Sequence, residues 1–481
     1  MRFSFIKNNL TIIFVFFVFA AYAQDRPNIL FILADDMGWG DVGYHGSVIK
    51  TPTIDRLARE GLELDQHYVY PQCTPTRVGL LTGRYTTRYG MPRPINMQVL
   101  PYGVETMASV LKSSGYETCI SGKWHLGSSP EYGPNHYGFD HSYGGLTGAI
   151  HPWTKEYSSR RNPEFRKNWH RNEQLIEEEG IHTQLTVKEA VNWLQERNDE
   201  KPWFLYLAFH AVHTPIDASE QYKQLYANTE FYENQKKQES KLRFAAMTTE
   251  MDDGIKKVLD YLEQTGQLKN TLVVFTSDNG GIVLKEGKTA GKYPEPALES
   301  HVLSSNGKLK GQKATLYEGG IRVPTVVYWK GKLEPGKIDE SIIITDWLPT
   351  FAYLAGYIEP PLKNLKWDGK NIWPILDGEI ASLPDRPLYI RYIHNMIALR
   401  FGDWKLIKMS DTKFAHARMP GDDRSDRLYN IANDPFEEND LAAEYPEIVD
   451  KLNEMVEEEM KIDMPMRDAY EPIPTLNSDI Y

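Results

Sequence analysis

The chain of 481 residues contains only two cysteines, Cys73 and Cys119. So low a count excludes a small secreted scaffold held together by disulfide bonds. A single bridge between the two cysteines stays open. For Cys119, which lies in the strand-like stretch 116–120, we favour the role of a small buried apolar side chain.

Long apolar runs are absent after residue 23. Within residues 1–23, Arg2 and Lys7 precede a mostly apolar stretch, 10–19, and small residues end the segment at Ala23. This order is typical of a secretory signal peptide that is cleaved after Ala23. The apolar stretch is shorter than the ~20 residues of a spanning helix, so we expect no stable membrane anchor. We expect an exported protein, in the periplasm rather than fully secreted.

The chain also lacks an excess of basic residues. Removing Arg2 and Lys7 leaves 52 of the 54 basic residues against 66 acidic ones, a net charge of −14 for residues 24–481. This balance produces no field that would attract phosphate groups, so we expect no nucleic acid partner. The remaining 458 of the 481 residues are too many for one ordinary domain.

Apolar, β-rich runs alternate with helical patterns, which indicates an α/β fold. We expect a large mixed, mainly parallel sheet between layers of helices over residues 24–385. Short strands joined by tight turns begin near Pro384–Pro387, so we expect a smaller α+β subdomain over residues 386–481. The expected strands are 28–33, 116–120, 203–209, 272–276, 323–329, 388–391, 396–400 and 404–408, and the expected helices are 53–60, 74–81, 186–196 and 446–461.

Two oxygen-rich clusters follow two of the expected strands. Asp35 and Asp36 come after the first strand, and Asp278 and Asn279 come after a later one. Ligands of open α/β sheets bind beyond the carboxyl ends of the strands, so we expect both clusters to converge on one hard cation. Three carboxylates and an amide oxygen suit calcium; magnesium stays open, and zinc is disfavoured because no histidine belongs to the cluster. Either pair alone could equally be a cap or turn former.

Cys73 precedes a segment, 74–81, that can form a helix with Pro75 in its first turn. Arg77 then lies one turn beyond Cys73 on the same face. This arrangement places a reactive group and a guanidinium beside a helix N-terminus, which favours an anion. A thiolate nucleophile is an alternative, although no thiol-protease signature accompanies it.

The stretch Cys73–Tyr85, with its Cys-x-Pro-x-Arg core, resembles the signature by which type I sulfatases have their cysteine oxidised to formylglycine. Further blocks stand in the order found in sulfatases, a family of the alkaline-phosphatase superfamily. The sequence motifs at 101–106, 138–144, 345–350 and 428–435 resemble those of the N-acetylgalactosamine-4-sulfatase (arylsulfatase B) branch. One departure is Thr76, where many members have serine, but the hydroxyl is retained. The further blocks are 27–36, 122–127, 210–215, 277–281, 311–313 and 318–324.

The resemblance implies catalytic roles for five polar residues of these blocks. Arg77 would hold the formylglycine hydroxyls, and Lys123 and Lys313 would bind sulfate oxygens. His125 would assist release of the sulfate ester formed on formylglycine. His213 would protonate the leaving group or bind sulfate. Three other residues are expected to support the loops rather than to react: His210, Glu318 and Arg322.

The resemblance also implies how position 73 reacts. A formylglycine-generating or anaerobic sulfatase-maturating enzyme would oxidise Cys73, and the aldehyde would be hydrated to a gem-diol. One hydroxyl would attack sulfur and expel the sugar alcohol; deprotonation of the other would eliminate sulfate and restore the aldehyde. A serine would form a sulfate ester that has no second hydroxyl and so could not eliminate sulfate in this way. The implied calcium ligands are Asp35, Asp36, Cys73, Asp278 and Asn279.

Residues 151–171 contain six basic and two acidic residues, a local charge of +4, with aromatic residues interleaved. Aromatic rings can stack on sugars, and arginines can bind sulfate or carboxylate. We therefore expect carbohydrate subsites here, with His151, Trp153, Arg160 and Arg161 as substrate contacts. A solvated basic loop anchored by its aromatic residues is the alternative.

The expected substrate is a sulfated poly- or oligosaccharide, for example of marine algal origin. Two other functions stay open. Phosphomonoester and phosphonate monoester hydrolases share the metal scaffold of the superfamily, and an inactive sulfatase homologue could bind glycans. The set Lys123, His125, His213 and Lys313 favours sulfate, and the completeness of the reactive residues favours an enzyme.

Overall fold

The computed structural model describes residues 26–91, 97–157, 163–197, 200–283, 303–358, 367–393, 396–409 and 426–465. The predicted signal peptide therefore lies outside the described residues. Over the described ranges, no helix combines the length and apolar character needed to cross a membrane.

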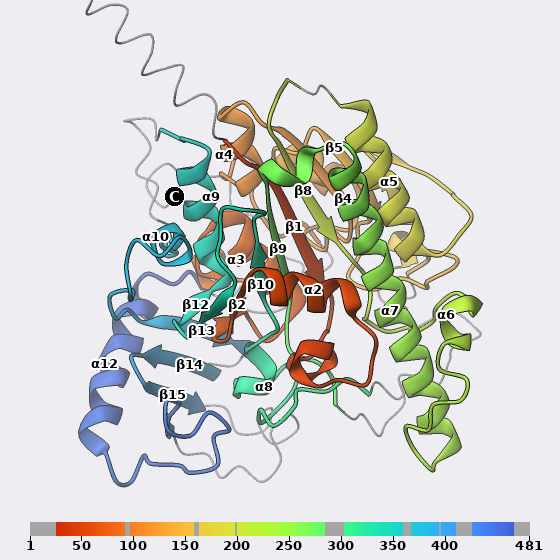
Figure 1. The fold of residues 1–481 in the computed structure, drawn as a ribbon. Helices are drawn as coiled ribbons and strands as arrows, with labels where there is room; N and C mark the ends of the chain where they lie inside the picture. Colours follow the sequence, from red (N-terminus) through yellow and green to blue (C-terminus); the bar gives the residue numbers. More distant parts are fainter. Residues whose placement is uncertain are drawn as a thin grey trace, which may run out of the picture.

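A ten-stranded mixed sheet forms the middle layer of the molecule (Figure 1). Its centre consists of adjacent parallel strands that are buried over nearly their whole length, which explains why they read as continuous apolar runs. In spatial order these are β9 (Thr271–Ser277), β1 (Asn28–Ala34), β8 (Trp203–Ala208) and β4 (Glu117–Gly122). The flanking strands are β10 (Val326–Tyr328), β2 (Leu62–Leu64) and β11 (Gly336–Ile338) beside β9, and β5 (His141–Gly145), β6 (Trp169–Arg171) and β7 (Gln174–Leu175) beside β4.

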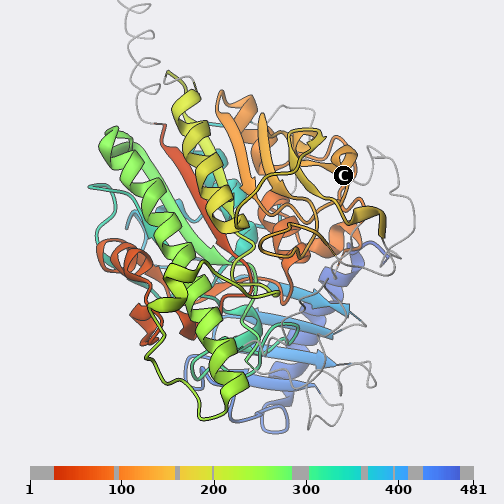
Figure 2. The same ribbon diagram turned by 90° about the vertical axis from the view of Figure 1, so that its right-hand side faces the viewer.

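Helices cover both faces of this sheet (Figure 2). Alternate residues of β1 belong to different cores: Phe31 packs in one and Ile32 in the other. The first core lies beneath α3 (Cys73–Thr82), α4 (Met107–Ser113) and α9 (Trp347–Leu354). The second lies beneath α2 (Pro52–Glu60), α5 (His182–Glu196) and α7 (Gln235–Gln264). Short elements complete this part: α6 (Glu220–Gln224), α8 (Glu318–Ile321), α10 (Trp373–Leu376) and the paired strands β3 (His67–Tyr68) and β12 (Ile342–Ile343).

A four-stranded antiparallel sheet follows toward the C-terminus. The helix α12 (Pro446–Lys461) packs on it through Leu452 and Val456, and the same core continues into the first core of the large sheet. The predicted boundary between residues 385 and 386 stays a prediction. The strands are β13 (Leu388–Tyr392), β14 (Met396–Phe401), β15 (Trp404–Met409) and β16 (Arg427–Asn430).

The expected α/β fold class is confirmed, and most expected elements occur within a few residues of their predicted bounds. The strand expected over 323–329 is shorter, Val326–Tyr328, and runs antiparallel to its neighbours. The 30-residue helix α7 has no clear apolar period, because its buried positions include polar side chains such as Thr248, Glu250 and Asp252. The length of α7 therefore could not be predicted from the sequence and is known only from the structure.

Candidate active site

Four parallel strands end side by side and lead into the candidate residues. The register pairs Ala34 with Ser277 and Gly122 with Ala208, so the loops after β1, β9, β4 and β8 begin at the same edge of the sheet. The predicted convergence of the two oxygen-rich clusters is present at this edge. The backbone N–H of Asp36 donates to Asp278 Oδ1 at 3.2 Å, and Asn279 Nδ2 donates to Asp36 Oδ1 at 2.8 Å.

Cys73 is the first residue of α3, one turn before Arg77, as the sequence predicts. The fully buried guanidinium of Arg77 donates to Asp278 Oδ2 from Nε at 3.2 Å and from Nη2 at 2.8 Å. Burial opposes the charge, but Tyr206 and Asp278 raise the pKa of Arg77 above its usual value. Thr76 keeps a structural role, since its hydroxyl donates to the carbonyl of Tyr70 at 3.2 Å.

Two lysines bind the acidic cluster from different loops. Lys123 Nζ donates to Asp35 Oδ2 at 2.5 Å, with both side chains fully buried. Lys313 Nζ donates to Asp36 Oδ1, also at 2.5 Å. Burial alone would raise the pKa of Asp36, but Lys313 and His213 hold that pKa below its usual range. Three cations therefore face three carboxylates: Arg77 and Lys123 are fully buried, and the side chain of Lys313 is 11% exposed.

Two histidines of the site, His125 and His210, are buried, and a glycine packs closely against each ring. A Cβ on Gly148 would lie 2.2 Å from His125 Nε2, and a Cβ on Gly145 would lie 2.5 Å from His210 Nε2, so both glycines allow close approach of a loop to a ring. Burial lowers the pKa of His125, with Lys123 adding to the effect. Both histidines are thus held in the neutral form, since burial also lowers the pKa of His210.

His213 corrects one expectation from the sequence, which placed no histidine in the acidic cluster. Its Nε2 lies 3.6 Å from Asp36 Oδ2, and one ligand atom each from Asp35, Asp36 and His213 lie within 4.8 Å of one another. The carbonyl of Thr214 lies 2.6 Å from Nδ1 and can only accept, so that nitrogen carries the proton of the neutral ring. Burial lowers the pKa of His213 to about 3, which leaves the lone pair of Nε2 available.

The polar atoms of the cluster fit a divalent metal ion. Asp35 Oδ1, Asp36 Oδ2 and Asn279 Oδ1 are buried and have no hydrogen-bond partner among the described residues. Burial, together with the charge of Asp278, raises the pKa of Asp35, so ionisation of all the carboxylates needs additional positive charge. Ligand atoms of Asp35, Cys73 and Asp278 also lie within 4.8 Å of one another. Oxygen ligands dominate the set, which suits calcium or magnesium.

Only part of the predicted carbohydrate-binding segment, residues 151–171, is exposed at the surface. Trp153 is 41% exposed, and its Nε1 donates to Asp217 Oδ2 at 2.8 Å. Two backbone N–H groups donate to His151 Nδ1, so Nε2 carries the proton of the neutral ring. Lys155 and Trp169 are buried, which removes them from a substrate-binding surface. Arg160 and Arg161 lie outside the described residues.

Both cysteines are free and buried, so no bridge joins them. Cys119 lies within β4 as a small core residue, as favoured from the sequence.

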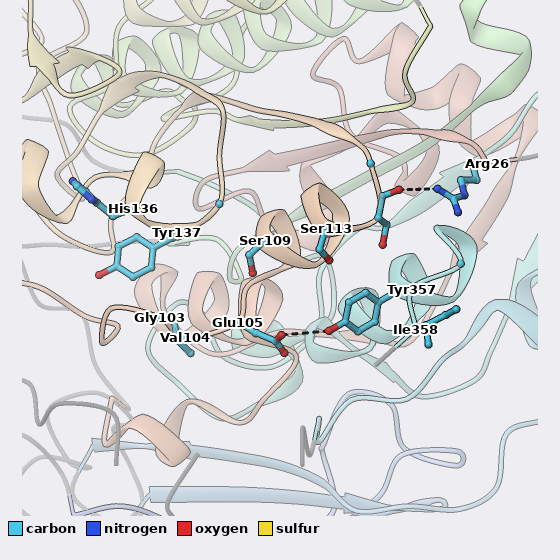
Figure 3. A pocket seen from close by; sticks show the side chains of 14 residues that line it. Arg26, Gly103, Val104, Glu105, Ser109, Ser113, His136, Tyr137, Tyr357 and Ile358 are labelled. Carbon is cyan, nitrogen blue, oxygen red and sulfur yellow. Dashed lines mark hydrogen bonds between the residues drawn. The ribbon is translucent and has the colours of Figure 1, made fainter. Parts of the chain in front are cut away.

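A separate surface cavity of about 870 Å³ includes Arg26, Ser109, His136 and Tyr357 in its wall (Figure 3). None of the candidate catalytic or metal residues lines it, so we do not assign the reaction to this cavity.

Sequence reasoning missed three kinds of supporting residue. Tyr206 Oη accepts from Arg77 Nη1 at 3.4 Å, and the two glycines beside the histidines permit their burial. Glu437 contacts the segment that carries Lys313 from the C-terminal part of the chain. No local motif signals these contacts, because each joins residues far apart in sequence.

The fold and this site define the class of protein. The sequence model of the sulfatase family matches residues 27–357, and the chain belongs to that family. It is therefore a sulfuric ester hydrolase. Mouse (Mus musculus) arylsulfatase J is 32% identical over 488 residues, covering 92% of this chain and 77% of the relative. N-acetylgalactosamine-6-sulfatase of Rattus norvegicus is 32% identical over 411 residues, covering 80% and 72%.

A solved structure is similar over almost the whole fold. The crystal structure of Ps i-CgsB in complex with k-i-k-neocarrahexaose has a TM-score of 0.78 and 29% sequence identity. The match covers 92% of this chain and 94% of that one. The expected membership of the sulfatase family is thus confirmed, whereas the special likeness to the 4-sulfatase branch stays a prediction.

Proposed function

We propose that this sulfatase removes sulfate from a sulfated poly- or oligosaccharide, with formylglycine at position 73 and calcium in the acidic cluster. The observation that supports this proposal is the convergence of Cys73, three buried carboxylates and three cations at one edge of the sheet. Such a site can neutralise both a metal ion and a sulfate group. The residues that would hold calcium are Asp35, Asp36, Asp278, Asn279 and the modified residue 73.

Calcium, when bound, would supply positive charge that stabilises the nucleophile and the sulfate oxygens. The oxygen atoms outnumber the single imidazole in the cluster, which favours calcium over zinc. Arg77, fixed by Asp278, would orient the hydroxyls of residue 73. Lys123 and Lys313 would bind the sulfate oxygens as charge develops on them in the transition state.

The two histidines would move protons at different atoms. His125 is neutral and buried, so it can accept a proton from the second hydroxyl of residue 73 and thereby assist release of sulfate. A sulfate ester beside His213 adds negative charge, which favours the protonated ring. In that form Nε2 can donate to the departing sugar oxygen.

The sugar would extend from this site across the segment that begins at His151. The Nε2–H of His151 can donate to a sugar or sulfate oxygen, and the ring of Trp153, held by Asp217, offers a stacking surface. Arg160 and Arg161 are proposed as further contacts. The k-i-k-neocarrahexaose bound in the similar Ps i-CgsB structure supports a polysaccharide substrate, and the predicted signal peptide supports export to the periplasm.

A panel of defined sulfated oligosaccharides, assayed for released sulfate and for product mass, tests this proposal. We expect sulfate release from at least one member, with the sugar chain left intact. Matched 4-nitrophenyl sulfate and phosphate esters test the phosphoesterase alternative, for which phosphate would be the better substrate. Glycan binding without sulfate release by fully modified protein would establish the inactive homologue instead.

A further inference from the structure

The Lys313 loop (residues 310–318) carries the lysine for which we propose a contact with sulfate, and it has little regular structure before α8. At its centre, Lys313 Nζ donates to Asp36 Oδ1 at 2.5 Å. The loop is closed at its base, where the N–H of Gly319 donates to the carbonyl of Lys310 at 2.7 Å. The N–H of Lys313 donates to the carbonyl of Gly281 at 3.1 Å and that of Ala314 to the carbonyl of Pro71 at 2.8 Å, and further contacts hold the two ends of the loop.

One residue of the C-terminal part of the chain, Glu437, binds both ends. Its carbonyl accepts from Lys310 Nζ at 3.0 Å, and its carboxylate oxygen Oε2 accepts from the backbone N–H of Glu318 at 2.7 Å. Glu437 has no exposed surface. It lies 124 positions from Lys313 in sequence, between β16 and α12.

The backbone of Glu437 indicates that its side chain is needed. Its φ of 57° lies in the left-handed region, which glycine adopts readily and which is unfavourable for a long side chain. A glycine would relieve this conformation and would satisfy the turn. The glutamate adds a carboxylate, which accepts from the N–H of Glu318 in the Lys313 loop and pairs with Lys405.

An ion network holds this carboxylate in place. Lys405 Nζ, from β15, lies 2.8 Å from both Glu437 Oε1 and Glu318 Oε1. All three side chains are almost completely buried. Tyr68 Oη donates to the other oxygen of Glu318 at 2.9 Å. Figure 1 shows α8 beside the strands of the C-terminal sheet, which is the direction from which Lys405 reaches it.

We propose that Glu437 is a positioning residue, which acts on the sulfate group through the Lys313 loop. Its carboxylate oxygen fixes the N–H of Glu318 and its carbonyl fixes Lys310, so the C-terminal sheet sets where Lys313 lies. This inference rests on the proposed role of Lys313 in binding sulfate. It assigns the C-terminal part of the chain a role in catalysis in addition to its role in folding.

A double-mutant cycle between Glu437→Gly and Lys313→Ala tests the proposal. The readouts are kcat/KM for 4-nitrophenyl sulfate and the Kd of inorganic sulfate by calorimetry, both with calcium present. We expect Glu437→Gly to lower kcat/KM by about 10- to 100-fold through misplacement of Lys313, and to weaken sulfate binding. In the Lys313→Ala background, the same glycine substitution should have no further effect, because the group that it displaces is already absent.

Each other outcome overturns the inference. Equal losses from Glu437→Gly in both backgrounds would mean a general structural role. No loss from Glu437→Gly, while Lys313→Ala is impaired, would refute the positioning role and leave the proposed function intact. No effect of Lys313→Ala on either readout would refute the proposed role of Lys313 and the inference with it.

Two further substitutions of Glu437 and one control variant keep the test decisive. Glu437→Gln retains an oxygen that can accept from Glu318 N, so we expect it to recover most of the lost kcat/KM; impairment equal to that of glycine would overturn the proposal. If Glu437→Gly does not fold, Glu437→Asn replaces it in the cycle, since asparagine tolerates the left-handed region but is too short to reach Glu318. The exposed neighbour provides the matched control, Glu438→Gly, which should leave both readouts unchanged.

Discussion

Lys123 Nζ lies 2.5 Å from Asp35 Oδ2, and neither side chain has any exposed surface. The two residues follow different strands, β4 and β1, between which β8 lies. Burial and the charge of Asp278 raise the pKa of Asp35, whereas Lys123 and Arg77 lower it. The pair therefore belongs to a larger electrostatic unit at the edge of the sheet.

Replacing Lys123 by methionine tests its proposed contact with sulfate. We expect kcat to fall by about 10²- to 10³-fold, the typical loss when one donor to a transition-state oxyanion is removed. Lys112→Met is the matched control, because Lys112 is about half exposed and pairs with Asp140 at the surface. Steady-state kinetics on the sulfated substrate measure both variants. A change in KM alone would contradict a role in the transition state.

Removal of the metal should lower both activity and stability. The unpartnered oxygens of Asp35, Asp36 and Asn279 would face one another without a cation. A ligand present at about 1,000 times its Kd stabilises the folded state by about 4 kcal/mol, so we expect EGTA to lower the melting temperature clearly. Calcium should restore both properties, and magnesium or zinc should not. Full activity in EGTA would refute the calcium site.

Asn279→Ala tests the same site by removing one of its proposed calcium ligands. The loss of one amide oxygen should reduce the increase in melting temperature on adding calcium, while Asn439→Ala, at an exposed position, should leave it unchanged. Calcium titrations followed by thermal unfolding measure both. An unaltered calcium response of Asn279→Ala would remove that residue from the ligand set.

Mass spectrometry of the peptide around residue 73 tests the modification. We expect the loss of the thiol and the appearance of an aldehyde in active protein. Cys73→Ser should abolish turnover, because a serine sulfate ester has no second hydroxyl whose deprotonation would eliminate sulfate. Cys119→Ala is the matched control and should remain active, since Cys119 is a buried residue within β4. Unmodified Cys73 in fully active protein would overturn the mechanism.

Trp153→Ala should affect long substrates more than short ones. We expect KM for a sulfated oligosaccharide to rise about tenfold, equivalent to about 1.4 kcal/mol of lost binding, with little change for 4-nitrophenyl sulfate. Tyr353→Ala, which removes an exposed ring from α9, should change neither value. Equal effects of Trp153→Ala on both substrates would contradict an outer sugar subsite.

The stability of the protein should depend on the ionisation of Glu437. Burial raises the pKa of Glu437 to about 7, an effect that Lys405 opposes and Glu318 strengthens. Because the folded pKa exceeds the unfolded one, the stabilising contribution is complete below pH 4.5 and is lost as pH rises through 7.

Glu437→Gln removes this dependence. The free energy of unfolding of Glu437→Gln, relative to that of the unaltered protein, should therefore increase between pH 4.5 and about 8. Chemical denaturation at several pH values measures this difference. Glu438→Gln controls for the loss of one negative charge at an adjacent exposed position. A constant difference between Glu437→Gln and the unaltered protein over this range would show that Glu437 does not titrate there.

Much of the site could be predicted because its residues lie in short segments that follow strands. Asp35 and Asp36 come directly after β1, and Asp278 and Asn279 after β9, so their convergence followed from the general geometry of parallel sheets. The spacing of Cys73 and Arg77 on one helix was equally local. The family is confirmed, whereas the individual catalytic roles stay predictions until the substitutions are made.

Other relationships could not be read from the sequence. The presence of His213 beside Asp36 depends on β8 being the neighbour of β1, and strand order results from packing rather than from any local pattern. The burial of Lys155 depends in part on the carbonyl group of Gly180, 25 residues away, which accepts from Nζ at 2.9 Å.

The sequence by itself determined the alternating α/β pattern, the order of the sulfatase blocks and the chemical groups available for reaction. Local residue type and spacing suffice for these, because they depend on neighbours along the chain. The tertiary structure alone decided which cation faces which carboxylate, as Lys123 faces Asp35 and Lys313 faces Asp36. It also decided that Glu437 holds the Lys313 loop, since the free energy of such buried contacts arises only when distant segments pack and exclude water.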